Sequence, residues 1–79
     1  MDSELKNAIH AVAKSMRDID TRNEVNQVDM ISGAVLMQAR ILVKHGLASI
    51  RRSRGNDVLV ISDDARPLFK ELGWSLKYG

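Results

Sequence analysis

The sequence lacks several residues on which very small proteins often rely for stability or chemistry. It has no cysteine, which excludes disulfide bonds and thiolate metal sites. Its two histidines, His10 and His45, do not have metal-ligand spacing, and we expect no metal or cofactor. It has no recognisable nucleophile–base pair and no glycine-rich phosphate loop. The sequence therefore predicts a protein that is not an enzyme.

Long apolar runs are also missing. No stretch approaches the roughly 18 residues that a membrane span needs, and residues 1–10 carry acids where a signal peptide carries lysines. We therefore expect a soluble cytoplasmic protein. A chain of 79 residues makes a single domain, residues 1–79, with a small core. Homodimer formation is a common way to stabilise such a core, and we expect it here.

One part of the chain lacks acidic residues altogether. Residues 30–56 contain five of the twelve lysines and arginines and none of the ten acids. The net charge of the whole chain is only +2, so the positive charge is concentrated in this segment. Such segregation is typical of a surface that binds a polyanion.

The first half of the sequence has the periodicity of helices. Apolar residues recur at steps of three and four over residues 3–18, with Asp2 or Ser3 as N-cap. We predict a second, short helix at about residues 22–30; a single helix over residues 22–45 is the alternative. Ser32 is placed to cap a helix over residues 33–45, which ends at Gly46. The inward face of the first helix is predicted to hold Leu5, Ala8, Ile9, Val12, Ala13 and Met16.

After Gly46 the apolar period changes from 3.6 to 2. Residues 47–53 and 57–62 read as two strands, and Gly55 and Asn56 are suited to the turn between them. Ser62 or Asp64 caps a last helix that ends near Gly73. The predicted fold class is therefore α+β: three helices, a two-stranded hairpin and a C-terminal helix.

The segment from Leu42 onward resembles a known family. Its order of helix, Lys-x-Gly-Leu, basic strand, glycine-bearing tip, Val-rich strand and capped helix resembles the winged helix-turn-helix DNA-binding domains of the MarR and ArsR type. The resemblance implies a minimal, phage- or plasmid-like regulator. The matching residues are Leu42, Lys44, Gly46, Leu47, Arg51, Arg52, Gly55, Val58, Val60, Ser62 and Ala65.

This resemblance implies how duplex DNA would be bound. The helix over residues 33–45 would enter the major groove, and the wing over residues 51–57 would follow the backbone or the minor groove. The arginines of the wing alternatively serve to keep an exposed sheet edge soluble. The candidate DNA-binding residues are Ser32, Gln38, Arg40, Lys44, Arg51, Arg52 and Arg54.

A second set of residues is apolar or aromatic and has two possible roles. Met37 and Ile41 point away from the main apolar face of their helix, and Trp74 and Tyr78 lie in the C-terminal tail. They either pack against the first helix or form an interface with a second copy or another protein. The two function classes are thus a DNA-binding transcriptional regulator and a winged-helix protein-interaction module.

Overall fold

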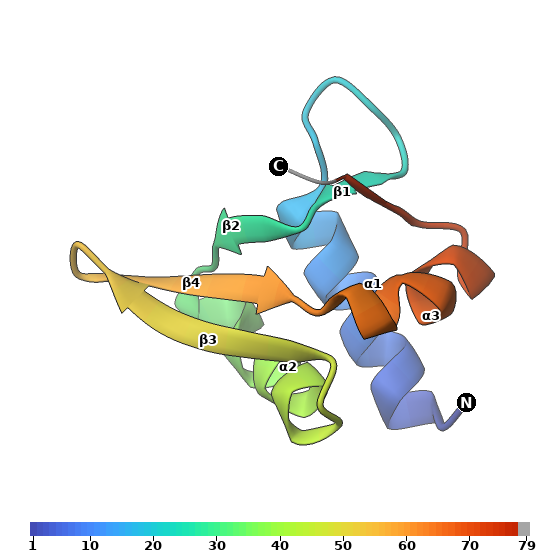
Figure 1. Ribbon diagram of the computed structural model, residues 1–79, viewed down its shortest axis with the longest axis horizontal. Coiled ribbons are helices and arrows are strands. Elements are labelled where there is room, and N and C mark those ends of the chain that lie inside the picture. Colours follow the sequence, from blue (N-terminus) through green and yellow to red (C-terminus); the bar gives the residue numbers. More distant parts are fainter. Residues whose placement is uncertain (78–79) are drawn as a thin grey trace.

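The computed structural model describes residues 1–77 of the chain, and the predicted role of Tyr78 lies outside them. The described part is an α+β domain in which helices and short strands alternate (Figure 1). The elements in chain order are α1 (Ser3–Met16), β1 (Glu24–Asn26), β2 (Val28–Met30), α2 (Gly33–Lys44), β3 (Ala48–Ser53), β4 (Asn56–Ile61), the 3₁₀ turn η1 (Asp63–Ala65), α3 (Arg66–Glu71) and β5 (Ser75–Lys77).

Helix α1 confirms the sequence prediction in its start and in its buried face, but it ends at Met16, two residues earlier than predicted. Asp2 is the N-cap, and its carboxylate accepts hydrogen bonds from the backbone N–H groups of Glu4 and Leu5. All six residues predicted to face inward are buried. The regular spacing of these residues gives α1 one continuous apolar stripe, which forms the centre of the core.

Helix α2 also forms where it was predicted, and it ends at a glycine. Gly46 has φ +74°, a backbone conformation that residues with a side chain rarely adopt. Ala39 and Leu42 are buried between α1 and the strands. Val43, which the periodicity places with them, is instead 38% exposed, because only a narrow stripe of α2 is covered.

The predicted helix over residues 22–30 is wrong, and so is the alternative of one helix over residues 22–45. Residues 24–26 and 28–30 form β1 and β2 instead. Asn and Asp residues give this stretch a low intrinsic helix propensity, and Val residues suit strands. Pairing with strands from the second half of the chain then decides the outcome. The described residues therefore lack the first helix of a helix-turn-helix pair.

Two small sheets organise the strands. β1 pairs with β5 in parallel, and β2, β4 and β3 form an antiparallel sheet in that order. The β3–β4 hairpin was predicted, but its turn is one residue earlier than expected. Arg54 and Gly55, at φ +53° and +81°, occupy the turn, and Asn56 already belongs to β4. Two consecutive residues with positive φ match the right-handed twist of a tight hairpin.

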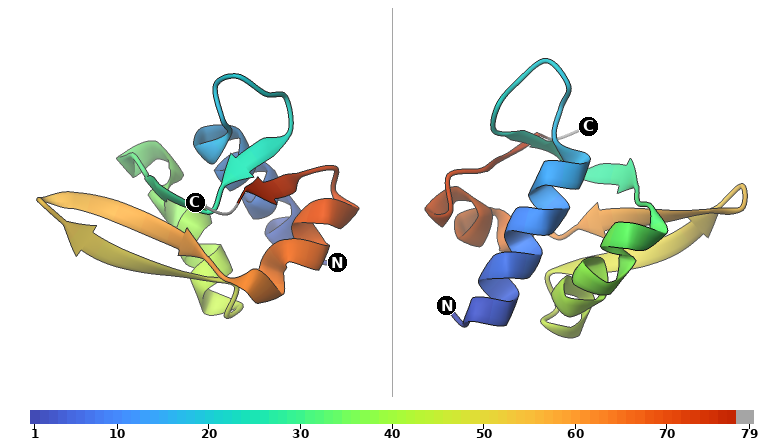
Figure 2. Two further views of the ribbon diagram at one scale, coloured as in Figure 1. Left: turned by 45° about the horizontal axis from the view of Figure 1, so that its top comes forward. Right: turned by 180° about the vertical axis from the view of Figure 1, so that it is seen from behind.

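The helices cover only one face of the three-stranded sheet. Helices α1 and α2 lie side by side behind it, and the hairpin extends well beyond them (Figures 1 and 2). Leu59 and Ile61 of β4 point into the core, where they meet α1, α2 and Phe69 of α3. The opposite face of the sheet is not covered by any element of residues 1–77, as the view in Figure 1 shows.

Candidate nucleic-acid interface

The packing of α2 against the core determines which of its side chains face the solvent. Because Ala39 and Leu42 are held in the core, Met37 and Arg40 face the solvent and Gln38 is half-buried. Ser32 stands at the N-cap position, but its side chain makes no capping hydrogen bond. Its exposed hydroxyl is therefore available to a ligand at the start of the helix.

The hairpin places its three arginines in three different directions. Arg51 is paired with Val58 in the register, so its side chain lies on the uncovered face of the sheet. Arg52 is paired with Asp57 on the opposite face, and its Nη1 lies 3.4 Å from the Asp57 carboxylate. Arg54 is part of the turn at the tip. The tip therefore presents guanidinium groups on both of its faces and at its end.

The five cationic residues of the acid-free segment are all exposed. They are Arg40, Lys44, Arg51, Arg52 and Arg54. Within residues 1–77, the ion pair with Asp57 is the one salt bridge that involves any of the five. The Asp57 carboxylate offsets one of these five positive charges, so the surface keeps a net positive charge.

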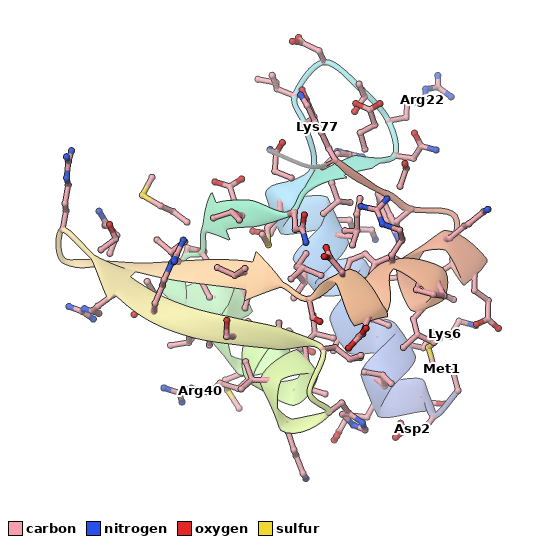
Figure 3. The ribbon with its side chains drawn as sticks, viewed as in Figure 1. Met1, Asp2, Lys6, Arg22, Arg40 and Lys77 are labelled. Atoms are coloured by element: carbon pink, nitrogen blue, oxygen red, sulfur yellow. The ribbon has the colours of Figure 1, made fainter. Side chains whose placement is uncertain are left out.

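The positions of Arg40 and Lys44 on α2 differ with respect to the hairpin. Figure 3 shows Arg40 reaching out from α2 below β3, on the side of the molecule where the hairpin extends. Lys44 ends α2 and precedes the start of β3, so it lies at the opposite end of the hairpin from Arg54. The structure thus places Arg40 on the side of the hairpin and Lys44 at the margin of this surface.

The predicted interface residues do not form one surface. Met37 is 74% exposed, whereas Ile41 is partly buried and packs against the core. Trp74 is half-buried against α1, and its indole Nε1 donates a hydrogen bond to Nδ1 of His10 at 3.0 Å. Met37 is therefore the member of this set within residues 1–77 that is free to meet a partner.

Two exposed apolar features were not identified from the sequence. The first is the uncovered face of the sheet, where the register aligns Val28 with Val60 and Met30 with Val58. The second is Ile19, which is 96% exposed in the loop that follows α1. The expected helix over residues 22–30 concealed the first feature, because this face exists only where residues 28–30 form the strand β2. The exposure of Ile19 could have been predicted from the sequence, because two acidic residues, Asp18 and Asp20, flank it.

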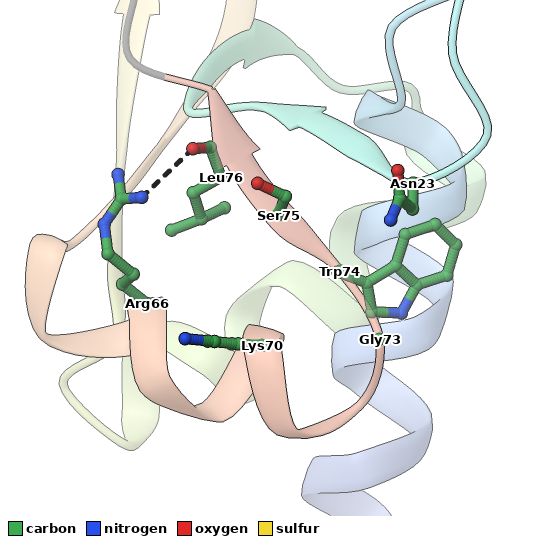
Figure 4. A pocket seen from close by; sticks show the side chains of 7 residues that line it. All are labelled: Asn23, Arg66, Lys70, Gly73, Trp74, Ser75 and Leu76. Atoms are coloured by element: carbon green, nitrogen blue, oxygen red, sulfur yellow. Dashed lines mark hydrogen bonds between the residues drawn. The ribbon is translucent and has the colours of Figure 1, made fainter.

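A hollow of about 470 Å³ lies between α3, β5 and the start of β1 (Figure 4). Arg66 and Lys70 of α3 line it together with Trp74 and residues of β5, and Arg66 Nη1 donates a hydrogen bond to the carbonyl oxygen of Leu76 at 3.2 Å. None of the predicted DNA-binding residues lines this hollow. It is therefore separate from the cationic surface of α2 and the hairpin.

Two other kinds of feature, a metal site and a membrane-spanning helix, are absent from the described part of the chain. Residues 1–77 contain no group of three or more side chains that could hold a metal ion. Over the same range, no helix has the length and apolar character required to cross a bilayer. Comparison of the chain with protein-family models, with curated proteins and with solved structures gives no match.

Proposed function

We propose that the protein binds double-stranded DNA through the outward side of α2 and the tip of the β3–β4 hairpin, as a transcriptional regulator. One observation carries the proposal. The acid-free segment of the sequence folds into one helix and one protruding hairpin, and all five of its cationic side chains are exposed. A surface of this kind neutralises phosphates and releases counterions on binding.

The chemistry of the hairpin suits the DNA backbone. Arginine has a planar fork of donors that matches a phosphate group, and it is attracted to a narrow minor groove. A protruding two-stranded hairpin with Arg54 at its tip can reach along the duplex beyond the body of the protein. These contacts position the protein on DNA and carry no base sequence information.

Helix α2 supplies the groups for sequence recognition. An α-helix fits the major groove, where Gln pairs with adenine and Arg with guanine through two hydrogen bonds each. Arg40 is exposed and Gln38 is half-buried, so Arg40 has the greater reach. Base recognition thus depends on few side chains, and we expect modest sequence specificity beside a larger electrostatic contribution.

We further infer that the domain is a reduced winged helix. The succession of α2, Gly46, a basic β3, a glycine-bearing tip and a Val-rich β4 supports this inference. The element missing from the described residues is the helix that, in a helix-turn-helix, crosses the DNA backbone. In this chain the anchoring contacts would come from the hairpin arginines instead.

The test is a titration of duplex DNA of random sequence at several salt concentrations. Three phosphate contacts per protomer give a slope of log K against log salt of about −2.7. Arg54→Ala should flatten this slope by about one unit and weaken binding to all sequences alike. Arg22→Ala removes an exposed arginine from the loop far from the hairpin and is the matched control (Figure 3). A folded protein that fails to bind at low salt contradicts the proposal.

The second candidate function is a protein-interaction module built on the same fold. The exposure of Met37 favours it, because a large apolar side chain in the middle of a DNA-reading helix is unusual. This candidate predicts binding that depends on Met37 and changes little with salt. The same titration therefore separates the two functions.

A further inference from the structure

The uncovered face of the β2–β4–β3 sheet is apolar over β2 and β4, although no element within residues 1–77 covers it, whereas β3 contributes Ser49 and Arg51 to it. Val28, Met30, Val58 and Val60 share this face, and Val28 and Met30 are 46% and 61% exposed. Strand β4 contains the uninterrupted run Val58-Leu59-Val60-Ile61, a pattern typical of strands that are buried on both faces. The helices cover only the Leu59 and Ile61 side. The sequence of β4 is thus suited to burial on both faces, and no element of residues 1–77 supplies the second layer.

The loop after α1 has the complementary character. Ile19 stands almost fully in solvent between Asp18 and Asp20. It belongs to the loop between α1 and β1, which projects from the body (Figure 1). The loop is held by its own hydrogen bonds: Asp18 N–H donates to the Glu24 carbonyl at 2.8 Å, and Asp20 N–H donates to the Asp18 carboxylate at 3.0 Å. Because the loop is already ordered, burial of the Ile19 side chain would cost little conformational entropy.

The sheet face and the loop also carry side chains of opposite charge. Arg51 borders the apolar face directly beside Val58, and the pairing registers place no acidic side chain on that face. The loop also carries the exposed Arg17 and Arg22, and the Asp18 carboxylate is hydrogen-bonded to Lys77, so the exposed acid next to Ile19 that is left to meet a cation is Asp20. Docking would therefore place Ile19 on the valines and Asp20 near the guanidinium of Arg51.

We propose that the protein self-associates, with the Ile19 loop of one copy seated on the uncovered sheet face of a second copy. Both halves of the contact are in the same chain, so they are present in equal amounts. If the loop of each copy docks on the sheet face of the other, the two identical contacts form a closed two-fold dimer. Helix α2 lies behind the sheet (Figures 1 and 2), so α2 of both copies stays accessible to DNA, whereas Arg51 would face Asp20 of the second copy instead of a phosphate.

The first experiment measures self-association of single variants by sedimentation. Ile19→Asp and Met30→Glu each remove apolar area from the proposed contact. Met30→Glu also places a negative charge near Asp20 of the second copy, and the two charges repel each other. Each substitution should weaken self-association by about tenfold or more. Both positions are more than half exposed, so the fold should tolerate the changes, and circular dichroism checks this. Met37→Glu is the matched control, because it places the same charge on another methionine that is more than half exposed, on α2.

The second experiment mixes the two defective proteins. In a mixture of Ile19→Asp with Met30→Glu, the intact loop of the second variant can dock on the intact sheet of the first. A species of two chains should therefore reappear in the mixture, although each protein alone is monomeric. Asp20→Lys combined with Arg51→Glu in one chain should likewise restore part of the association lost in each single variant.

Several results would overturn the proposal. A wild-type protein that is monomeric at about 100 μM has no such interface at a useful strength. A dimer disrupted by Met37→Glu but not by Met30→Glu associates through α2 instead. A dimer weakened by both sheet and loop variants, but not restored on mixing them, does not use a contact between loop and sheet. None of these results bears on DNA binding, which the salt titration tests separately.

Discussion

Trp74 and His10 are 64 positions apart in the sequence and share a hydrogen bond of 3.0 Å. The indole Nε1 is the donor, and Nδ1 of the imidazole is the acceptor. The two rings meet edge to face, with centroids 6.1 Å apart and an angle of 64° between their planes. This contact attaches the segment between α3 and β5 to the middle of α1.

We expect Trp74→Phe to lower the free energy of unfolding by about 1–2 kcal/mol, because it removes a partly buried donor and some ring area. Urea denaturation followed by circular dichroism measures the change. His10→Ala in both backgrounds completes a double-mutant cycle, with an expected coupling of about 0.5–1.5 kcal/mol. A coupling near zero would mean that the hydrogen bond adds nothing to stability.

Lys77 and Asp18 connect β5 to the loop after α1, with Nζ and Oδ2 2.6 Å apart. The hydrogen bond from Lys77, helped by the Asp20 backbone N–H, lowers the pKa of the Asp18 carboxyl below its usual 3.8. The hydrogen bond to Asp18 raises the pKa of Lys77 above its usual 10.5. Asp18 therefore stabilises the fold above its unfolded pKa, and this contribution is lost as pH falls through the lowered folded value. The contribution of Lys77 is lost as pH rises through its raised folded value.

Asp18→Asn should thus destabilise the protein most near neutral pH. The difference from wild type should shrink below the usual carboxyl pKa of 3.8 and above the usual lysine pKa of 10.5. Urea midpoints measured across this range check the profile. Asp20→Asn, at the exposed neighbouring acid, should cause a smaller change. A constant difference at all pH values would show that the ion pair is not its source.

Arg54 has φ +53°, which is unusual for a residue with a long side chain. Asparagine tolerates this conformation better, so Arg54→Asn should stabilise the protein by about 0.5–1 kcal/mol while it weakens DNA binding. Thermal unfolding and the salt titration measure the two effects. Arg54→Ala removes the charge but keeps the strained conformation, so it should bring no gain in stability. A less stable Arg54→Asn variant would contradict the assignment of strain to the tip.

The proposed roles of α2 and the hairpin predict different losses. If Arg40 or Gln38 reads a base, alanine at that position should cost about 1–3 kcal/mol on the preferred DNA site and much less on random duplex. Arg54→Ala should cost the same on both. Selection of a preferred sequence from random duplexes, followed by binding measurements, distinguishes these patterns. Equal losses on both DNAs for the α2 variants would assign α2 to backbone contacts.

Helices α1 and α2 and the β3–β4 hairpin could be predicted because each depends on residues that are close together in the sequence. Helix α1 follows from a single apolar stripe and an N-cap at Asp2, and α2 from its stripe and the stop at Gly46. The hairpin follows from the change of period after Gly46. The concentration of arginines was also visible in the sequence, because charge is read without knowledge of the fold.

The elements that were missed depend on residues far away in the sequence. Val25 and Val28 are spaced as on a helix, and only their pairing with Leu76 and Val60 makes strands of them. β5 is three residues long and exists through its partner β1. The exposed sheet face escaped prediction for the same reason, since it requires β2 to be a strand. The sequence also could not show which of Arg51 and Arg52 lies on the uncovered face of the sheet, because only the strand register decides this.

The parallel pairing of β1 with β5 has a consequence for the order of folding. It joins Glu24 to Ser75 and so closes a loop of about 50 residues, whereas the β3–β4 hairpin closes over two. Contacts of such long range form late, after the hairpin and the α1–α2 pair have restricted the chain. Truncating the buried Leu76 of β5 should therefore accelerate unfolding and leave the refolding rate nearly unchanged. The β1–β5 pair thus governs how long the native state persists, and the hairpin and helices govern how quickly it is reached.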